Sequence, residues 1–486
     1  MNTEAPLVGR HFIAGAWHDG AGQVPDINPS DTRETVGLFP AGTADLVAEA
    51  ARAAQAAQPA WAATSPQIRH DVLQRIGAAL NDRREEIGRV LAREEGKTLA
   101  EGIAETVRAS QVFTFFAGEC LRTPGEHLAS LRPGVEVEIT REAVGVAGVI
   151  APWNFPIAIP AWKVAPALAY GNAVVFKPAE VVPATSLLLT RIIADSGLPA
   201  GVFNTVFGAG RVIGEAMVAS SDINAISFTG SVATGRHIAK GCVTANPMKK
   251  VLTELGGKNP LVVLDDADLD VAVEVAVNGA FFSTGQRCTA SSRLIVTRGI
   301  HDHFVERVVA RMAQLKVGNA LDPATHIGPV VDAKQLEQDL RYVALGREEG
   351  AELVTGGQRL ELAEPGFYLS PALFTGVRNS MRIAQEEIFG PVAAVIQVAD
   401  YEEALATAND TEFGLSSGIC TTSLKYASHF KRASKAGMVM VNLPTAGVDY
   451  HAPFGGRRNS SYGAREQGRY AVEFYTTVKT AYTLPG

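Results

Sequence analysis

The chain has 486 residues, 47% of them hydrophobic, and this length exceeds what one hydrophobic core usually supports, so we expect two or three domains. The formal net charge of −7 gives no reason to expect nucleic acid or an anionic membrane surface as a partner. No apolar run is long enough to cross a bilayer, and the first residues lack the basic start and apolar stretch of a signal peptide.

The cysteines also indicate the compartment and exclude one class of site. The chain has four, all widely separated and without a CxxC pair: Cys120, Cys242, Cys288 and Cys420. They are too sparse for a disulfide framework or a zinc cage and fit a reducing cytosol. We therefore expect a cytoplasmic protein that needs no metal.

The N-terminal part is predicted to contain strands, then helices, then an arm. Residues 11–40 indicate short strands and turns, and two helices follow. The second helix begins at Ser65, a good N-cap before a proline, and Gly96 offers its end. Residues 135–140 alternate between apolar and polar side chains, which predicts a strand with one solvated face, standing off the body in a hairpin.

From residue 144 the pattern changes to short apolar strands separated by helices. The first series is VGVAGVIAP, NAVVFKP, FNTVFG and AISFTG, and the second is KNPLVVLDD, RLIVTRG, PVAAVIQV and GMVMVNLP. Buried strands that alternate with helices build parallel sheets, so the simplest interpretation is two α/β domains. The tail EFYTTVKTAYT is strand-like and is predicted to pair with the 135–140 arm of a neighbouring subunit.

Candidate ligand-binding residues follow strands of the first series. Lys177 ends one strand and Glu180 comes three residues later, where parallel sheets bind ligands and where both could hold ribose hydroxyls. Gly210, Gly214 and Gly230 follow two further strands, and glycine at such a turn lets the backbone approach a pyrophosphate. Neither glycine stretch matches GxGxxG in full, so a plain tight turn explains each about equally well.

Cys288 differs from the other cysteines in its surroundings. It lies in the polar segment FFSTGQRCTASSR, directly after Arg287, and a neighbouring cation favours the thiolate. The segment alone leaves a nucleophile and an ordinary loop cysteine equally open. Cys120, Cys242 and Cys420 have apolar surroundings, which are typical of core packing.

Two more residues are candidates because of where they stand in the chain. Glu254 ends an apolar strand just before a Gly-Gly turn, so it is either a general base or a solvated loop acid. Asn154 lies between the prolines of PWNFP, directly after another strand. Its amide either faces a ligand or belongs to a corner that only turns the chain.

Taken together, these motifs resemble the aldehyde dehydrogenase superfamily in order and spacing. The stretches PWNFP, ELGGKNP, GQRCTA and EEIFGPV carry the resemblance and contain Asn154, Glu254, Cys288 and Glu387. The resemblance covers essentially the whole chain, as far as PFGG at 453–456. One motif alone is weak, whereas the four together are very specific.

The resemblance implies an α/β fold of the aldehyde dehydrogenase type, with two parallel-sheet α/β domains plus a small β oligomerisation element. The segments that it implies are a dinucleotide-binding domain (1–122 and 144–252), a catalytic domain (253–452), an oligomerisation arm (123–143 and 468–486) and a return segment to the cofactor domain (453–467). It further implies a homodimer or homotetramer in which subunits exchange edge strands.

In chemical terms, the resemblance implies that the Cys288 thiolate attacks an aldehyde and that the adduct loses hydride to become a thioester. Asn154 and the Cys288 backbone N–H would hold the oxyanion, and Glu254 would activate the water that hydrolyses the thioester. NAD+ or NADP+ would accept the hydride; Glu180 repels a 2′-phosphate and favours NAD+, whereas Lys177 can pair with that phosphate. The residues implied in cofactor binding are Pro152, Trp153, Lys177, Glu180, Gly210, Gly214, Phe228, Gly230, Ser231, Leu255, Glu387 and Phe389.

The C-terminal stretch PFGGRRNSSYGAREQG bears on the substrate. Common family members read PFGGxKxSGxGRE, whereas this chain has an extra residue and Arg458 at the lysine position. Within the family, the stretch resembles the α-ketoglutaric semialdehyde (2,5-dioxopentanoate) dehydrogenases of sugar-acid catabolism. A substrate carboxylate needs a cation, and Arg287 is either that cation or a brace for the loop. Phe155 and Phe454 are the other candidates for substrate binding.

Alternatives stay open for the substrate and for the class of function. Succinic semialdehyde, or a broad range of aldehydes, is the alternative substrate. A CoA-acylating dehydrogenase shares the cysteine but does not need Glu254 as a base for hydrolysis. A cofactor-independent thiol hydrolase leaves Lys177, Glu180 and Glu387 unexplained, and a non-catalytic binding protein has no use for Cys288.

Overall fold

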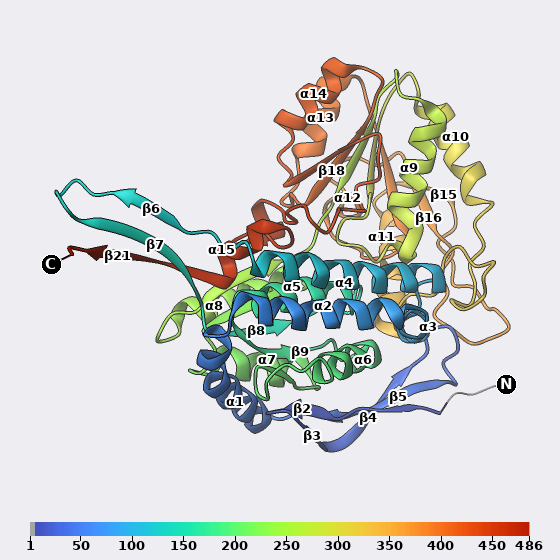
Figure 1. Ribbon diagram of the computed structural model, residues 1–486. Coiled ribbons are helices and arrows are strands. Elements are labelled where there is room, and N and C mark those ends of the chain that lie inside the picture. The colour runs from blue at the N-terminus through green and yellow to red at the C-terminus, as the bar shows by residue number, and fades with distance from the viewer. Residues whose placement is uncertain (1–4, 486) are drawn as a thin grey trace.

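The computed structural model describes residues 5–485, in which two large β-sheets carry most of the chain (Figure 1). The eight-stranded sheet has the order β20-β12-β11-β8-β9-β10-β2-β3, and its strands from β12 to β10 run parallel. Its strands are β2 (His11–Ile13), β3 (Ala16–His18), β8 (Val146–Ile150), β9 (Ala173–Lys177), β10 (Phe203–Thr205), β11 (Ala225–Thr229), β12 (Lys250–Glu254) and β20 (Ser461–Tyr462).

Both faces of this sheet are covered by helices, because alternate side chains of its strands enter two different cores. In β9, Val174 and Phe176 join one apolar cluster, while Ala173 and Val175 join another. This burial on both faces explains why the strands read as unbroken apolar runs. The helices of this half are α1 (Ala44–Ala62), α2 (Pro66–Asp82), α3 (Arg84–Glu95), α4 (Leu99–Cys120), α5 (Ala158–Ala169), α6 (Pro183–Ala194), α7 (Gly210–Ala219) and α8 (Val232–Thr244).

The prediction of two helices before the arm was incomplete, since the structure has four. The Ser65 hydroxyl caps α2 as expected, but α2 ends at Asp82 because Arg83 leaves helical geometry. Gly96, at φ 92°, ends α3 instead. Helix α4 was not predicted. It begins with a capping box, in which the Thr98 side chain accepts the Glu101 backbone N–H and the Glu101 side chain accepts the Thr98 backbone N–H.

The seven-stranded sheet has the order β15-β16-β17-β14-β13-β18-β19, with every neighbouring pair parallel except β15–β16. The four predicted strands of the second series are β13, β14, β17 and β19. Its strands are β13 (Pro260–Val263), β14 (Arg293–Thr297), β15 (Glu352–Thr355), β16 (Ala372–Thr375), β17 (Val392–Val398), β18 (Ser416–Cys420) and β19 (Met438–Val441). Its helices are α9 (Leu269–Phe281), α10 (His301–Met312), α11 (Ala333–Glu348), α12 (Arg382–Gln385), α13 (Tyr401–Asn409) and α14 (Leu424–Ala433).

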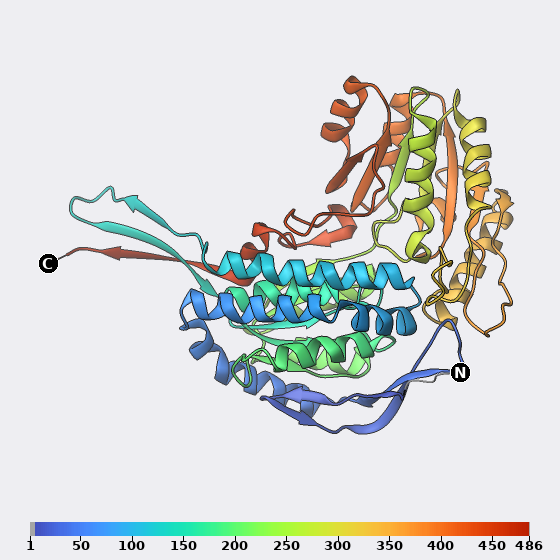
Figure 2. The same cartoon turned by 45° about the vertical axis from the view of Figure 1, so that its right-hand side comes forward.

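A three-stranded arm of β6 (Glu126–Ala129), β7 (Glu136–Ala143) and β21 (Thr476–Thr483) projects from the body (Figures 1 and 2). Pairing of the tail with a neighbouring subunit's arm was the wrong prediction, because β21 pairs with β7 of its own chain along its whole length. The cause lies at the base of the arm. After α15 (Val472–Tyr475), the Tyr475 carbonyl accepts the Val144 N–H and the Asn172 amide, which places β21 beside β7.

The N-terminal segment adds a small sheet of β1 (Leu7–Val8), β5 (Thr35–Ala41) and β4 (Ala21–Ile27). Among residues 5–485, no helix combines the length and the apolarity that a membrane crossing needs. The same residues contain no group of three or more His, Cys, Asp or Glu side chains placed to hold a metal ion.

Candidate active site

The carboxyl ends of the parallel strands in the eight-stranded sheet bring the predicted residues together. Asn154 follows β8, Lys177 ends β9, Gly230 follows β11, and Glu254 ends β12. Since these strands are parallel neighbours, their carboxyl ends share one edge of the sheet, where open α/β sheets bind ligands. Cys288 reaches this edge from the other half of the chain, after α9 and a short 3-10 helix, η1 (Phe282–Gly285).

A cavity of about 530 Å³ lies at this edge and has the size of a cofactor or ligand site. All twelve residues predicted to bind a cofactor line it, and so do Asn154 and Cys288. The sequence analysis missed the wall formed by the start of α11, from which Asp332, Gln335 and Gln338 line the cavity. Asp332 could have been recognised as an N-cap, but no sequence signal places that helix end against the other half.

One end of the cavity carries the pair Lys177 and Glu180. Lys177 is buried, and burial lowers the pKa of its ammonium to about 8, opposed by the nearby Glu180 carboxylate. Glu180 is exposed and accepts the backbone N–H of Gly210, the first residue of α7, at 3.0 Å. A cation and a carboxylate at a helix N-terminus form a polar end suited to a ribose and its substituents.

The middle of the cavity fits the backbone of a dinucleotide. The N-terminus of the 13-residue helix α8 lies there, capped by the Ser231 hydroxyl, and such helix ends favour phosphate groups. Gly210, at the start of α7, also lines the cavity, 3.6 Å from the Lys177 ammonium as measured from an ideal Cβ position. The Trp153 and Phe389 rings pack edge to face, with 5.2 Å between ring centres, and form part of the cavity wall. The residues present therefore fit a nicotinamide dinucleotide.

Glu387 contacts the cavity beside the nucleophile. Its Oε1 accepts the Gly257 N–H at 3.0 Å, and its carboxylate packs so closely on Gly256 that any side chain there would collide with it. Burial raises the pKa of Glu387 to about 7, while that hydrogen bond and the Lys258 ammonium oppose the shift. A carboxylate in this position is suited to accept hydroxyl groups of a second ribose.

The segment that carries Cys288 is held in a strained conformation. Ser283 and Thr284 both have positive φ, 50° and 55°, and Glu101 fixes the turn by accepting the Ser283 N–H and hydroxyl at 2.8 Å each. After the turn, the Cys288 carbonyl accepts the Asn259 amide at 2.8 Å. Residues in such strained backbone conformations are often found at functional sites, and these two lie within five residues of Cys288.

The thiol of Cys288 is partly exposed and faces the cavity. Burial of the sulfur raises its pKa well above the usual range, and the carboxylates of Glu387 and Glu254 raise it further. These surroundings therefore favour the thiol form of Cys288. Cys120, Cys242 and Cys420 are buried, which confirms the prediction that they belong to the core.

The amide of Asn154 is held next to the nucleophile. Its side-chain nitrogen donates to the backbone carbonyl of Gln286 at 3.0 Å, and the backbone carbonyl of Asn154 accepts the Lys97 ammonium at 2.7 Å. Lys97 is fully buried and pairs with Glu105 at 2.6 Å. The sequence analysis did not single out Lys97 or Glu105, because no motif marks a buried ion pair.

Glu254 lies next to this group but does not line the cavity. Its Oε2 accepts the Ser461 hydroxyl at 2.6 Å, from a segment more than two hundred residues further along the chain. Burial raises the pKa of Glu254 well above its usual range, and the Glu466 carboxylate raises it further. The Ser461 hydroxyl opposes the shift, as do the nearby cations Lys163 and Arg465.

The three predicted substrate residues lie outside the cavity lining. The Arg287 guanidinium pairs with Glu101 at 3.3 Å, and it also donates to Ser283. These contacts favour the bracing role over the carboxylate role. The Lys97 ammonium lies 4.0 Å from the Phe155 ring centre, and Phe454 stacks on Trp162 at 5.3 Å between ring centres.

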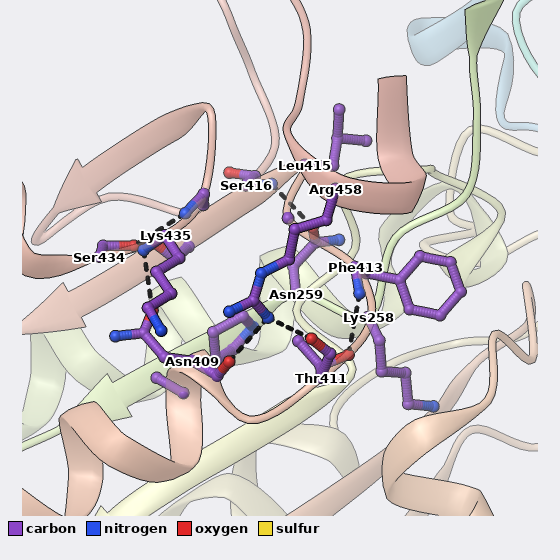
Figure 3. Close-up of a pocket in the computed structure, with 15 residues that line it drawn as sticks. Lys258, Asn259, Asn409, Thr411, Phe413, Leu415, Ser416, Ser434, Lys435 and Arg458 are labelled. Carbon is purple, nitrogen blue, oxygen red and sulfur yellow. Dashed lines mark hydrogen bonds between the residues drawn. The ribbon is translucent and has the colours of Figure 1, made fainter. Parts of the chain in front are cut away.

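Arg458, at the position where the family pattern has lysine, faces a different place (Figure 3). Its guanidinium donates to the backbone carbonyls of Asn409, at 2.8 Å, and Thr411, just after α13. The pocket drawn in Figure 3 is only about 10 Å³, enough for a single water, and a wider hollow of about 490 Å³ adjoins the same residues. Arg458 therefore ties the C-terminal segment to α13 and makes no contact with the cavity at Cys288.

A thiol and a fixed amide donor thus share a cavity with residues suited to a dinucleotide, which is compatible with a dehydrogenase. The sequence model described as the aldehyde dehydrogenase family matches residues 17–481, so the chain belongs to the aldehyde dehydrogenase family. Its α/β fold is the fold of that family, as predicted.

Several relatives are similar over their full length. The α-ketoglutaric semialdehyde dehydrogenase of Bacillus subtilis (strain 168) is 42% identical, with 98% of both chains covered. The 2,5-dioxopentanoate dehydrogenase of Saccharolobus solfataricus is 38% identical, covering 97% of this chain and 98% of that one. A betaine aldehyde dehydrogenase of Mesorhizobium japonicum is 39% identical, covering 98% and 97%.

Solved structures give the same family. Betaine aldehyde dehydrogenase from Staphylococcus aureus in complex with NAD+ superimposes with a TM-score of 0.95 at 34% identity, covering 98% of this chain and 94% of that one. An aldehyde dehydrogenase from Brucella melitensis biovar abortus 2308 gives a TM-score of 0.94 at 34% identity, covering 99% of both chains.

Proposed function

We propose that this aldehyde dehydrogenase oxidises α-ketoglutaric semialdehyde to α-ketoglutarate in the cytoplasm, within sugar-acid catabolism. One observation carries the catalytic part: Cys288 and Asn154 line the same cavity as all the residues predicted to bind the dinucleotide. The substrate rests on the C-terminal stretch PFGGRRNSSYGAREQG and on relatives at 38–42% identity that carry this activity in their names.

The reaction begins at sulfur. The Cys288 thiolate forms a bond to the aldehyde carbon, and the second amide hydrogen of Asn154, with the Cys288 N–H, holds the new oxyanion. NAD+ or NADP+, when bound, accepts the hydride that leaves this carbon. Glu254 then takes a proton from water, the water oxygen bonds to the thioester carbon, and the C–S bond breaks to release the acid and the thiolate.

For the cofactor we propose NAD+ as the preferred form. Lys177 and Glu180 would hold the adenosine ribose, the N-terminus of α8 the pyrophosphate, and Glu387 the nicotinamide ribose. The Glu180 carboxylate repels a 2′-phosphate. Replacing Glu180 by Gln should therefore raise kcat/KM with NADP+, relative to NAD+, by roughly tenfold; an unchanged ratio removes Glu180 from the choice.

Initial rates on a panel of aldehydes test the substrate. The panel holds α-ketoglutaric semialdehyde, succinic semialdehyde, glutaraldehyde, benzaldehyde and betaine aldehyde, each with NAD+ and NADP+ and without CoA. A lead of roughly tenfold for the first, about 1.4 kcal/mol in the transition state, supports the proposal. Equal rates on all would make the enzyme a broad-specificity dehydrogenase. Formation of reduced cofactor only when CoA is added would replace hydrolysis by acyl transfer to CoA.

For the assembly we propose a homodimer or homotetramer built through the arm, with the domain limits stated above. The arm leaves large apolar side chains exposed on strand β21, where Val478 is 58% and Tyr482 is 61% exposed. Large apolar side chains that gather on an exposed face often mark a surface that a partner covers. Light scattering on the full chain should give two or four subunits, and removal of 476–486 should give a monomer.

A further inference from the structure

The position of the Glu254 carboxylate does not match its use as a base. It is buried, with 2% of its surface exposed, and does not line the cavity that Cys288 lines. Its Oε2 accepts the Ser461 hydroxyl, while its Oε1 has no partner among the described residues. This Oε1 faces Gly455, where a Cβ would lie only 2.8 Å away. The carboxylate is therefore directed toward the C-terminal segment.

The Ser461 hydroxyl accepts one hydrogen bond and donates one. Its oxygen accepts the Gly456 N–H at 2.6 Å, so its own hydrogen is available for Glu254. The backbones agree, since Glu254 and Ser461 stand opposite each other where β12 pairs with β20. The hydrogen bond is thus a cross-strand contact that the sheet itself sets up.

We propose that Ser461 is a positioning residue that holds the Glu254 carboxylate away from Cys288, and that thioester hydrolysis begins when this hydrogen bond breaks. This rests on the proposed function, in which Glu254 takes the proton of the attacking water. While it is held back, the carboxylate adds less negative charge beside the sulfur, which favours the thiolate during attack on the aldehyde. Once the thioester has formed, no charge on sulfur opposes its approach.

The charged groups that face Glu254 also influence its pKa, and therefore the pH dependence of hydrolysis. They are Glu466 and Arg465 from the C-terminal segment, Lys163 from α5, and the thiol of Cys288. Lys163 forms an ion pair with Glu466 and also donates to Ser227 at 2.8 Å. Replacing Ser461 by Ala changes none of these charges, so a shift with pH reports the loss of the hydroxyl and of its contacts with Glu254 and Gly456.

Hydrolysis is best measured apart from oxidation. The full-length enzyme is acetylated with p-nitrophenyl acetate without cofactor, and decay of the acetyl-enzyme is followed by intact mass spectrometry across a range of pH. The variants are Ser461→Ala, Ser461→Thr and Ser460→Ala. Ser460 is the matched control, because its buried hydroxyl accepts one backbone N–H, from Gly414 at 3.0 Å, and does not touch Glu254.

For Ser461→Ala we expect two changes. The acidic limb of the decay rate moves to higher pH, because the carboxylate loses a donor that favours its charged form. The rate on the plateau rises roughly tenfold, because no hydrogen bond to a charged group has to break. Ser461→Thr keeps the wild-type profile, and so does Ser460→Ala.

An unchanged limb in Ser461→Ala, a lower plateau, or the same shift in Ser460→Ala overturns the role of Ser461. These results leave the proposed function standing, provided that the wild type forms the acetyl-enzyme and Cys288→Ala does not. Failure of the wild type to be acetylated at Cys288 overturns the thioester route, and this inference with it.

Discussion

The side-chain amide of Asn154 donates a 3.0 Å hydrogen bond to the backbone carbonyl of Gln286, two residues before the nucleophile Cys288. The bond joins the loop after β8 in one half of the molecule to the nucleophile segment in the other. An amide nitrogen carries two hydrogens, so one is committed to Gln286 and the other is free for a developing oxyanion. The donor is therefore oriented before the substrate arrives.

Replacing Asn154 by Ala should lower kcat by roughly 10²–10³, since one oxyanion donor is lost. KM for the aldehyde should change little, because the charge that the amide stabilises develops only after attack. Steady-state kinetics with the preferred aldehyde measure both constants. Fluorescence melting provides the control for folding, and a kcat within twofold of the wild type would contradict the role.

Glu387 should influence the reactivity of Cys288 as well as the cofactor. Its carboxylate raises the pKa of the Cys288 thiol, so Glu387→Gln removes a negative charge and lowers that pKa. The rate of alkylation by iodoacetamide, measured against pH without cofactor, should rise at lower pH in the variant. Glu386→Gln is the neighbouring control, since Glu386 pairs with Arg382 at 2.7 Å and points elsewhere. Identical profiles for wild type and Glu387→Gln would refute the effect.

Lys177 should make NADP+ binding depend on pH. Its pKa is lowered to about 8, so below that pH the charged ammonium can pair with a 2′-phosphate. As the pH rises above 8, the side chain loses its proton and this ion pair is lost. The dissociation constant of NADP+ should increase roughly tenfold from pH 7 to pH 9, while that of NAD+ changes much less. Calorimetric titration measures both. Lys177→Met should abolish this pH dependence. If the dissociation constants of both cofactors change equally with pH, Lys177 does not bind the 2′-phosphate.

Arg287→Ala should weaken folding rather than change the choice of substrate. Arg287 and Glu101 form a mostly buried ion pair, with side chains 15% and 23% exposed. Loss of one partner leaves a buried charge and should lower the free energy of unfolding by about 2 kcal/mol. Urea unfolding measures this, with Glu101→Gln as the reciprocal variant. A normal stability, with KM raised for acidic aldehydes alone, would restore the carboxylate role.

The sequence predicted best those features that repeat or that fall at strand ends. The parallel strands followed from apolar runs, and Lys177, Gly230 and Glu254 were placed at the correct edge because parallel strands share one. The pairing of β21 was beyond the pattern, because it depends on the Tyr475 carbonyl at the base of the arm. Likewise, the sequence does not show that Arg287 forms an ion pair with Glu101, nearly two hundred residues earlier, because folding alone brings them together.

The contacts of Glu254 could not be predicted from the sequence either. The motif around it identifies a carboxylate, but its partner Ser461 becomes a neighbour only through the antiparallel pairing of β12 with β20. Sequence spacing carries no information about such a contact. The departure from the common family pattern at SSYGARE marked the segment as unusual without giving the reason.

The eight-stranded sheet takes its two outer borders from opposite ends of the chain, β2 and β3 near the start and β20 near the end. During synthesis, β12 is made more than two hundred residues before β20 can cover it. Until then β12, with Glu254 at its tip, is an open edge available to other strands. The contact of Ser461 with Glu254 therefore forms only after both borders of β12 are present, and mispairing at the open edge competes with it during folding.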